Sequence, residues 1–371
     1  MDVHLTERQQ KILWATVNYY IATAEPVGSQ ALAKEYEFSL SPATIRNVMG
    51  MLEKSGLLYQ PHTSAGRVPS DSGYRLYVDE LITPSHQLVH RVQQLLNKRL
   101  NPGQTSFETL VRHAAQILAT LSGCIALITL PQPTSAAIRH LHLVQVEPQR
   151  VMVILVTDSY ETHTVFMNLP AHLYQDENQN QNEEAEELIK QELQLLSNFL
   201  NHQLSGKLLS ELSELDWHSL DRQFQAFAES LKQLFGDLSQ RTHSSLPSPI
   251  LVGGLAEFLR QPEFSELAQA QNIIQMLEEE QDQLWPLMYE QAHDPSSLDC
   301  RPNSPIQIRI GAENPLKPIQ NCALVSSIYQ RGKAPVGSVG VLGPTRMAYD
   351  KVIAFVEGTA NFLSATISRP L

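Results

Sequence analysis

The sequence predicts an α+β protein of several domains, with a winged helix-turn-helix head and a body interrupted by an inserted, mainly helical segment. Three observations predict this class. Three short helical patterns and a hairpin pattern fill residues 6–69, and strand patterns lie on both sides of a Leu-rich helical segment. A chain of 371 residues is also long enough for two or three domains.

The first two helices are predicted from their caps. Thr6 and Gln9 have the spacing of a capping box, so a helix should begin there and continue to about Thr23. The sequence 25–28 breaks it, because proline and glycine disfavour a continuing helix. Ser29 should then cap a second helix over residues 30–36.

The third helix is expected to run from Pro42 to Lys54. Ser41 is a good N-cap, and proline at the first helical position lacks only an N–H that would have no partner there. One apolar stripe at helical spacing predicts the buried side: Ile45, Val48, Met49 and Leu52.

The opposite face of this helix combines long hydrogen-bond donors with small residues. At about 100° per residue, that face carries Ala43, Arg46, Asn47, Gly50 and Lys54. A glycine inside a helix costs about 1 kcal/mol relative to alanine, so a close approach by another molecule would explain it. Such a face suits base edges and phosphates. The alternative is an amphipathic surface helix with a chance glycine.

A hairpin pattern follows and completes a winged-helix arrangement. Residues 57–59 read as a strand, 64–66 supply turn residues, and 67–69 form the return. Polar and basic side chains on this wing could reach phosphates or a minor groove, whereas an ordinary polar hairpin is the alternative. The sequence therefore predicts the following DNA-contacting residues: Ser41, Ala43, Thr44, Arg46, Asn47, Lys54, His62, Thr63, Ser64 and Arg67.

Ser70 should cap a further helix that closes the head. An apolar stripe runs along it, and this stripe must pack on the head or on a second copy of it: Tyr74, Tyr77, Val78, Leu81 and Ile82. The sequence 83–85 then predicts a connecting loop between the head and the rest of the chain. The head is thus expected to span residues 1–83, and a helical linker residues 84–105.

Three sequence blocks carry a family resemblance. The runs HTSAGRVPSDSGYRLYVDEL (62–81), SPATIRNVM (41–49) and GPTRMAYDKVI (343–353) resemble the heat-inducible transcription repressor family HrcA. The resemblance implies a winged-helix domain, a GAF-like domain and a dimerising domain inserted into the latter. It also implies a homodimer that represses chaperone operons at an inverted-repeat DNA operator called CIRCE, with activity maintained by the GroE chaperonin. Gly50 stands where the resemblance implies a larger residue, so the resemblance does not define the base contacts around that turn of the helix.

The remainder of the chain divides into strands, an acidic helical block and further strands. Strands are expected at 124–130, 138–146, 151–157, 162–169, 306–310, 322–329 and 336–342, with a last helix at 346–366. The polar tract 176–187 reads as a flexible loop. Residues 176–247 hold five basic and thirteen acidic residues and are rich in Leu and Phe, so they should form an inserted dimerising domain. The GAF-like domain would then comprise 106–175 and 248–371.

Charge and cysteine content limit the class of protein. Residues 1–100 hold ten Lys/Arg and nine Asp/Glu, whereas residues 101–371 hold seventeen and thirty, for a net charge of −12. A near-neutral head on an acidic body suits nucleic-acid contact by the head only. The three cysteines, Cys124, Cys300 and Cys322, lack C-x-x-C spacing and should be reduced thiols. No signal peptide or long apolar run appears, so a soluble cytoplasmic protein without a membrane segment is expected.

No catalytic, cofactor or metal motif is recognisable. The sequence GSVGVLGPTR is not a P-loop, because no Lys-Ser/Thr closes it. A turn through Gly343, Thr345 and Arg346 could bind an anion or effector at a helix N-terminus, but a strand that packs closely and turns is the favoured interpretation. His140 and His142 lack the other ligands of a metal site. The sequence therefore indicates a binding protein. The alternatives are an effector-controlled winged-helix regulator and an enzyme with an appended winged helix.

Overall fold

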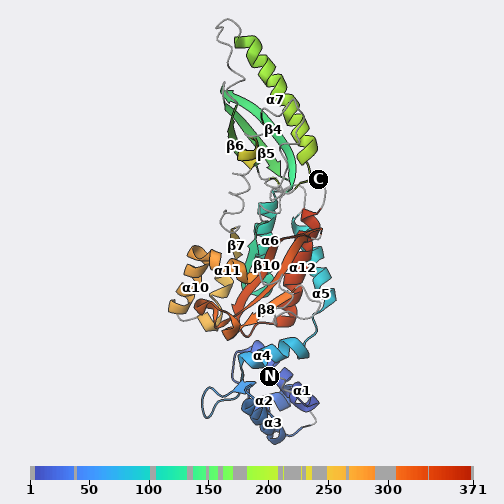
Figure 1. Cartoon of the computed structure of the whole chain (residues 1–371). Coiled ribbons are helices and arrows are strands. Elements are labelled where there is room, and N and C mark those ends of the chain that lie inside the picture. The colour runs from blue at the N-terminus through green and yellow to red at the C-terminus, as the bar shows by residue number, and fades with distance from the viewer. Residues whose placement is uncertain are drawn as a thin grey trace. The chain divides into compact units, whose positions relative to one another are not determined.

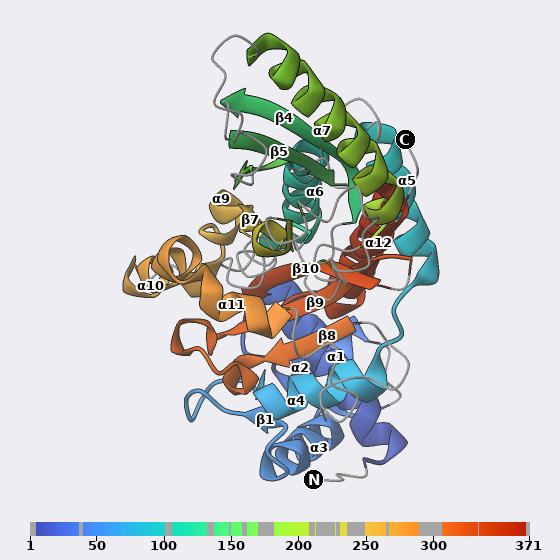
Figure 2. The same ribbon diagram turned by 45° about the horizontal axis from the view of Figure 1, so that its top comes forward.

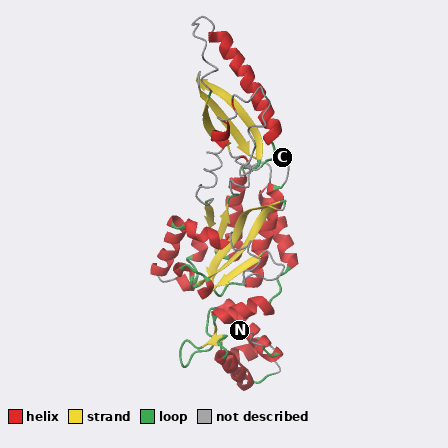
Figure 3. Ribbon diagram, viewed as in Figure 1, coloured by secondary structure: helices red, strands yellow, loops and turns green. Residues whose placement is uncertain are grey.

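The chain forms two compact units, shown in the computed structural model of Figures 1 and 3. Unit 1 consists of Met1–Leu130 and Pro249–Leu371, and unit 2 of Pro131–Ser248. Both contain helices and strands, which confirms the α+β class. The structure describes residues 5–36, 40–100, 106–131, 137–147, 150–157, 162–169, 182–207, 212, 227, 231–235, 249–264, 267–288, 306–332 and 334–368.

Unit 1 begins with three helices and a hairpin, in the order expected. The helices are α1 (Glu7–Thr23), α2 (Ser29–Glu35) and α3 (Pro42–Lys54), and the hairpin pairs β1 (Leu58–Tyr59) antiparallel with β2 (Val68–Pro69). The capping box at Thr6 and the Ser41 cap are both present. Ser29 differs from its expected role, because Gly28 is the N-cap of α2 and Ser29 is its first helical residue.

The stripe-bearing helix after the hairpin is buried inside unit 1. It forms α4 (Asp71–Leu76) and a π-helical turn, η1 (Tyr77–Leu81), and the Ser70 hydroxyl accepts a hydrogen bond of 3.1 Å from Gly73 N. Tyr74, Tyr77 and Val78 are at most 2% exposed. The stripe therefore packs within this chain and is not open to a second copy.

The rest of unit 1 is a five-stranded antiparallel sheet between two groups of helices. The strand order is β7-β3-β10-β9-β8. Their bounds are β3 (Ile125–Thr129), β7 (Ile250–Gly253), β8 (Ile306–Ile310), β9 (Cys322–Arg331) and β10 (Ala334–Pro344). Alternate β3 residues belong to two cores: Ala126 and Ile128 pack with one group of helices, Ile125 and Leu127 with the other.

The two groups of helices cover opposite faces of this sheet, as Figure 2 shows. The first comprises α5 (His86–Leu100), α6 (Phe107–Ser122) and α12 (Tyr349–Ile367), and the second includes α9 (Leu255–Phe258), α10 (Leu267–Glu279) and α11 (Gln281–Met288). The expected linker 84–105 contains α5, which packs on α12 so closely that a Cβ at Gly358 would lie 2.9 Å from the Val89 carbonyl oxygen. The described part of that segment is therefore part of the body and not a free connector.

Unit 2 is a three-stranded antiparallel sheet with a long helix on one face (Figure 2). The order is β4-β5-β6, with bounds β4 (Ile138–Glu147), β5 (Arg150–Thr157) and β6 (Thr162–Asn168), and the helix is α7 (Asn182–Leu204). Polar side chains of α7 pin β4: Ser197 Oγ donates to the Leu141 carbonyl oxygen at 3.0 Å, and Asn201 Oδ1 accepts from Leu141 N at 2.8 Å.

The limits of the insertion differ from those expected from the sequence. Strands β4, β5 and β6 were expected to join the GAF-like sheet, but they pair with one another and pack on α7, so the interruption spans 131–248 and not 176–247. The prediction that 151–156 is a central strand is confirmed. The polar tract 176–187 is partly helical, since α7 begins at Asn182. The remainder of the tract lies outside the described residues.

Two of the three cysteines, which were expected to be reduced thiols, lie among the described residues. Cys124 and Cys322 are free and buried, and burial raises the pKa of each thiol to about 12, so both are protonated and unreactive at neutral pH. Cys300 lies outside the described residues. Over the described ranges, no helix has the length and apolarity that a membrane crossing requires, and no three His, Cys, Asp or Glu side chains gather as metal ligands would.

Candidate nucleic-acid interface

Helix α3 presents the expected polar face to solvent. Its apolar stripe is buried, with Ile45 and Leu52 at 0% exposure, and this fixes the rotation of the helix about its axis. The side opposite is open: Ala43, Arg46, Asn47 and Lys54 are all exposed. The amide of Asn47 and the two cations therefore project from one surface.

The small residue in this face leaves a real gap. A Cβ built at Gly50 would meet no atom within 4 Å, so nothing inside the described chain requires glycine there. Met51, which lies next to the gap, is 46% exposed. Met51 was not among the residues predicted for this face, although its spacing of four from Asn47 places it there. An exposed thioether offers an apolar contact of the kind that thymine methyl groups accept.

Two other predicted residues act at the start of the helix. The Ser41 hydroxyl accepts from Thr44 N at 3.2 Å and lies 3.0 Å from the Thr44 hydroxyl. This is the N-cap geometry, in which the side-chain oxygen satisfies a backbone N–H that has no helical partner. In the free protein, Ser41 and Thr44 thus shape the N-terminus of α3.

The tip of the wing is exposed and braced from below. His62, Thr63 and Ser64 are exposed. The Gln60 side-chain nitrogen donates to the Thr63 carbonyl oxygen at 2.9 Å and to the Ala65 carbonyl oxygen at 2.8 Å. Gln60 was not predicted from the sequence, because its partners are set by the loop conformation. The wing is therefore a held loop with polar side chains outward.

Arg67 is engaged inside the head, in contrast to the other wing residues. Its guanidinium pairs with Glu53 at 2.9 Å, and its backbone exchanges two hydrogen bonds with Val27, of 2.8 and 2.9 Å. A Cβ at the neighbouring Gly66 would lie 2.4 Å from the Val27 carbonyl oxygen, so the chain crosses there at backbone contact. The structure therefore gives Arg67 a bracing role in the free protein, where a free phosphate ligand was expected.

The turn at Gly343, Thr345 and Arg346 is filled by the protein's own groups. A Cβ at Gly343 would lie 2.5 Å from Cys124 Sγ, and the Thr345 carbonyl oxygen accepts from the Tyr349 hydroxyl at 2.7 Å. The Arg346 guanidinium pairs with Glu263 and donates to Gln261 Oε1 at 3.0 Å. Helix α12 begins only at Tyr349. These contacts favour the structural interpretation of the turn over an anion site.

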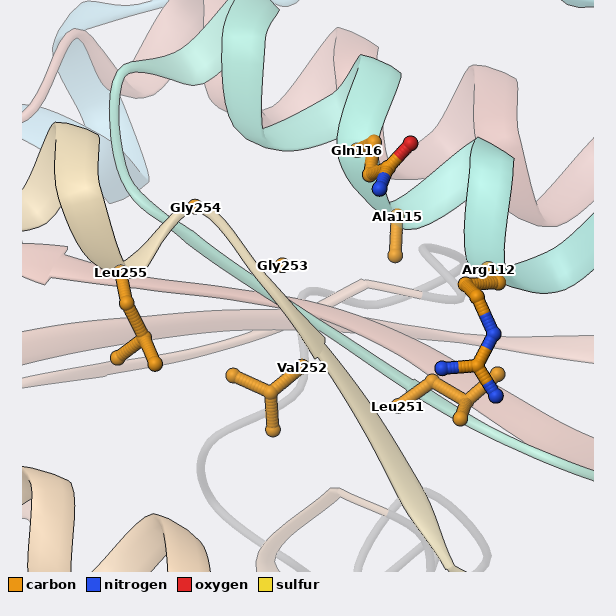
Figure 4. Close-up of a pocket in the computed structure, with 8 residues that line it drawn as sticks. All are labelled: Arg112, Ala115, Gln116, Leu251, Val252, Gly253, Gly254 and Leu255. Carbon is orange, nitrogen blue, oxygen red and sulfur yellow. The ribbon is translucent and has the colours of Figure 1, made fainter.

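A shallow hollow lies elsewhere in unit 1, between α6 and the edge strand β7. Figure 4 shows its lining, which encloses about 270 Å³: Arg112, Ala115, Gln116, Leu251, Val252, Gly253, Gly254 and Leu255. The Arg112 guanidinium pairs with Glu108 at 2.9 Å on the same helix. None of Gly343, Thr345 and Arg346 lines this hollow.

Comparison with known proteins agrees with these features. The family model described as "HrcA protein C terminal domain" matches residues 108–353. Proteins named heat-inducible transcription repressor HrcA from Cyanothece sp. and Acaryochloris marina are 57% and 58% identical, each over 100% of both chains. A solved structure described only as a hypothetical protein is 24% identical, with a TM-score of 0.60 over 98% of this chain and 99% of that one.

Proposed function

The chain belongs to the HrcA family of heat-inducible transcription repressors, and we propose that it represses by laying α3 in the major groove of its operator. As a member of this family it is a negative regulator of heat-shock transcription. A repressor acts on DNA, so we infer that it works in the cytoplasm. In this proposal residues 1–83 act as a winged helix, α3 as its recognition helix and residues 60–67 as the wing.

One observation carries the proposal: the solvent-facing row of Arg46, Asn47 and Lys54 beside the open position at Gly50. Asparagine can pair with both groups of an adenine edge, and the two cations lie where phosphates flank a groove. The gap lets the helix backbone approach the bases. The exposed wing tip would then touch the adjacent backbone or minor groove.

Asn47→Ala tests the assignment of α3. We expect the variant to lose roughly 1–3 kcal/mol of operator binding, with little change on random DNA, because a base-edge contact carries sequence information. Fluorescence anisotropy with operator and scrambled duplexes measures both affinities. Lys54→Ala is the matched comparison, since a phosphate contact should weaken both duplexes alike. Equal weakening of both duplexes by Asn47→Ala would contradict the base-reading role.

We also propose that the operator is the inverted repeat CIRCE and that the repressor binds it as a homodimer. A two-fold symmetric operator needs two recognition helices, one for each half-site. A GAF-like body and an inserted dimerising domain would hold the two recognition helices together in the dimer. Support comes from unit 2, where the sheet face away from α7 exposes Val144 (41%) and Phe166 (51%). Exposed apolar side chains that are aligned across strands are suited to pack against a second copy of the chain.

Control by the GroE chaperonin is the last part of the proposal. The body sheet is built from two distant parts of the chain, since β3 lies between β7 and β10, and Val339 is opposite Ile128. Such non-local pairing is slow and leaves apolar strands exposed before the sheet closes. The strand residues Ile128, Val339 and Val341 are all 0% exposed once folded. Chaperonin availability would then set the fraction of active repressor.

Refolding of the denatured full chain tests this mechanism. We expect a larger fraction of operator-binding molecules when chaperonin and ATP are present, and a smaller one when an excess of another unfolded protein competes. Titration with labelled operator counts the active molecules in each reaction. An equal active fraction with and without chaperonin, unaffected by the competitor, would refute chaperonin control and leave a small-molecule signal as the leading alternative.

A further inference from the structure

The junction between head and body within unit 1 is held by Arg75. Its Nε donates to Glu313 Oε1 at 2.9 Å. Its Nη2 donates to Glu313 Oε2 and, at 2.6 Å, to the Ile308 carbonyl oxygen. Arg75 lies on α4 of the head, whereas Ile308 lies on the edge strand β8 of the body. A two-pronged contact between guanidinium and carboxylate fixes direction as well as distance.

A carboxylate of α4, that of Asp71, also contacts the turn that carries Glu313. Asp71 Oδ2 accepts from Ala312 N at 2.9 Å. Gly311 has φ +56°, and a Cβ built on it would lie 2.1 Å from that carboxylate oxygen. The Asp71 side chain therefore occupies the space that any other residue at 311 would need. The Glu313 carboxylate is itself fixed, because it accepts from Ile310 N at 2.8 Å.

These polar contacts surround a buried apolar junction. The Tyr74 and Tyr349 rings lie 5.9 Å apart, and the two residues are 1% and 0% exposed. One continuous buried cluster includes Ile45 and Leu52 of α3, Tyr74 of α4 and Tyr349 of α12. The orientation of α4 on the body therefore determines the orientation of α3.

We infer that Arg75 is a positioning residue that sets the separation of the two recognition helices in the repressor dimer, and so the operator spacing that the protein accepts. The inference rests on the proposed dimeric binding to an inverted repeat. Arg75 needs no contact with DNA for this role. It acts through Glu313 and the Ile308 carbonyl oxygen, which hold the head in one direction. Without that contact, only the Asp71 hydrogen bond and the apolar junction described above orient the head, so its direction is less narrowly fixed and two heads can reach half-sites at other spacings.

The test compares Arg75→Ala with the unaltered full chain on three duplexes: the operator, the operator lengthened by half a helical turn in its spacer (about five base pairs), and a single half-site. We expect the unaltered protein to bind the lengthened operator roughly 10²-fold more weakly, because only one head can engage. For Arg75→Ala this penalty should fall below about tenfold, with half-site affinity unchanged. Arg112→Ala is the matched control, since its ion pair with Glu108 lies within one helix.

Two further variants keep the test independent of folding. Arg75→Lys retains the charge but not the fork and should lose most of the penalty, while Asp79→Ala removes only the partner of Arg75 within its own helical segment, at 3.4 Å, and should keep the penalty. An unchanged penalty in Arg75→Ala, or an equal loss on the half-site, would overturn the positioning role. If the unaltered chain shows no preference for operator over random DNA, the proposed function itself fails, which is a different result.

Discussion

Gly73→Ala is expected to destabilise the head by about 3 kcal/mol or more and to abolish operator binding, although Gly73 contacts no DNA in the proposed complex. A Cβ at this position would lie 2.1 Å from the Leu57 carbonyl oxygen. That carbonyl is held in place, because it accepts from Ser70 N at 3.1 Å, and the Ser70 hydroxyl accepts from Gly73 N. Neither backbone can yield without opening the base of the wing.

Thermal denaturation of the full chain, followed by circular dichroism and by limited proteolysis of the head, measures the loss. Gly50→Ala is the matched control for stability: its Cβ would meet no atom within 4 Å, and alanine is favoured over glycine in a helix by about 1 kcal/mol. That variant should be as stable as the natural chain or more so. A Gly73→Ala protein with an unchanged melting profile and intact head would show that the crossing at Leu57 is looser than the structure indicates.

The sequence predicted the parts of the fold that depend on neighbouring residues. The Thr6 capping box, the Ser41 cap and the strand at 306–310 are all found at the expected positions, because caps and periodicity act within one or two turns of the chain. The exposed face of α3 was predictable for the same reason. Once the apolar stripe is buried, helical geometry determines what faces outward.

Features that depend on distant partners were not predictable. Strand patterns at 138–169 were correct, but a strand pattern does not say which sheet the strand joins, and these strands form their own. Arg67 was predicted to contact phosphate, whereas in the free protein its guanidinium forms an ion pair with Glu53. Arg75 and Glu313 are 238 residues apart, so no local pattern connects them. Each of these three features is a contact between segments, which the local pattern of either segment cannot show.

Phe166→Asp is expected to convert the repressor to monomers and weaken operator binding roughly 10²–10⁴-fold, the range by which linked sites gain over a single one. Phe166 is opposite Met152, which is opposite Val144, so three apolar side chains lie in one row across the sheet. The Arg150 guanidinium lies 4.5 Å from the centre of the Phe166 ring and borders the row. The face of the sheet toward α7 is already buried, with Val153 and Leu155 at 0% exposure, so this row faces away from that core.

Sedimentation velocity gives the oligomeric state, and anisotropy on operator and half-site gives the affinities. The half-site affinity should be unaffected, because the head is unaltered. Leu195→Asp is the matched control: Leu195 is 50% exposed on α7, in the helical segment that composition first suggested as the interface. If Leu195→Asp yields monomers and Phe166→Asp remains a dimer, the helices make the contact and the open sheet face does not. Even if Arg150 pairs with the new carboxylate, burying this ion pair between two such faces costs the desolvation of both charges, so Phe166→Asp should separate the copies if the sheet face joins them.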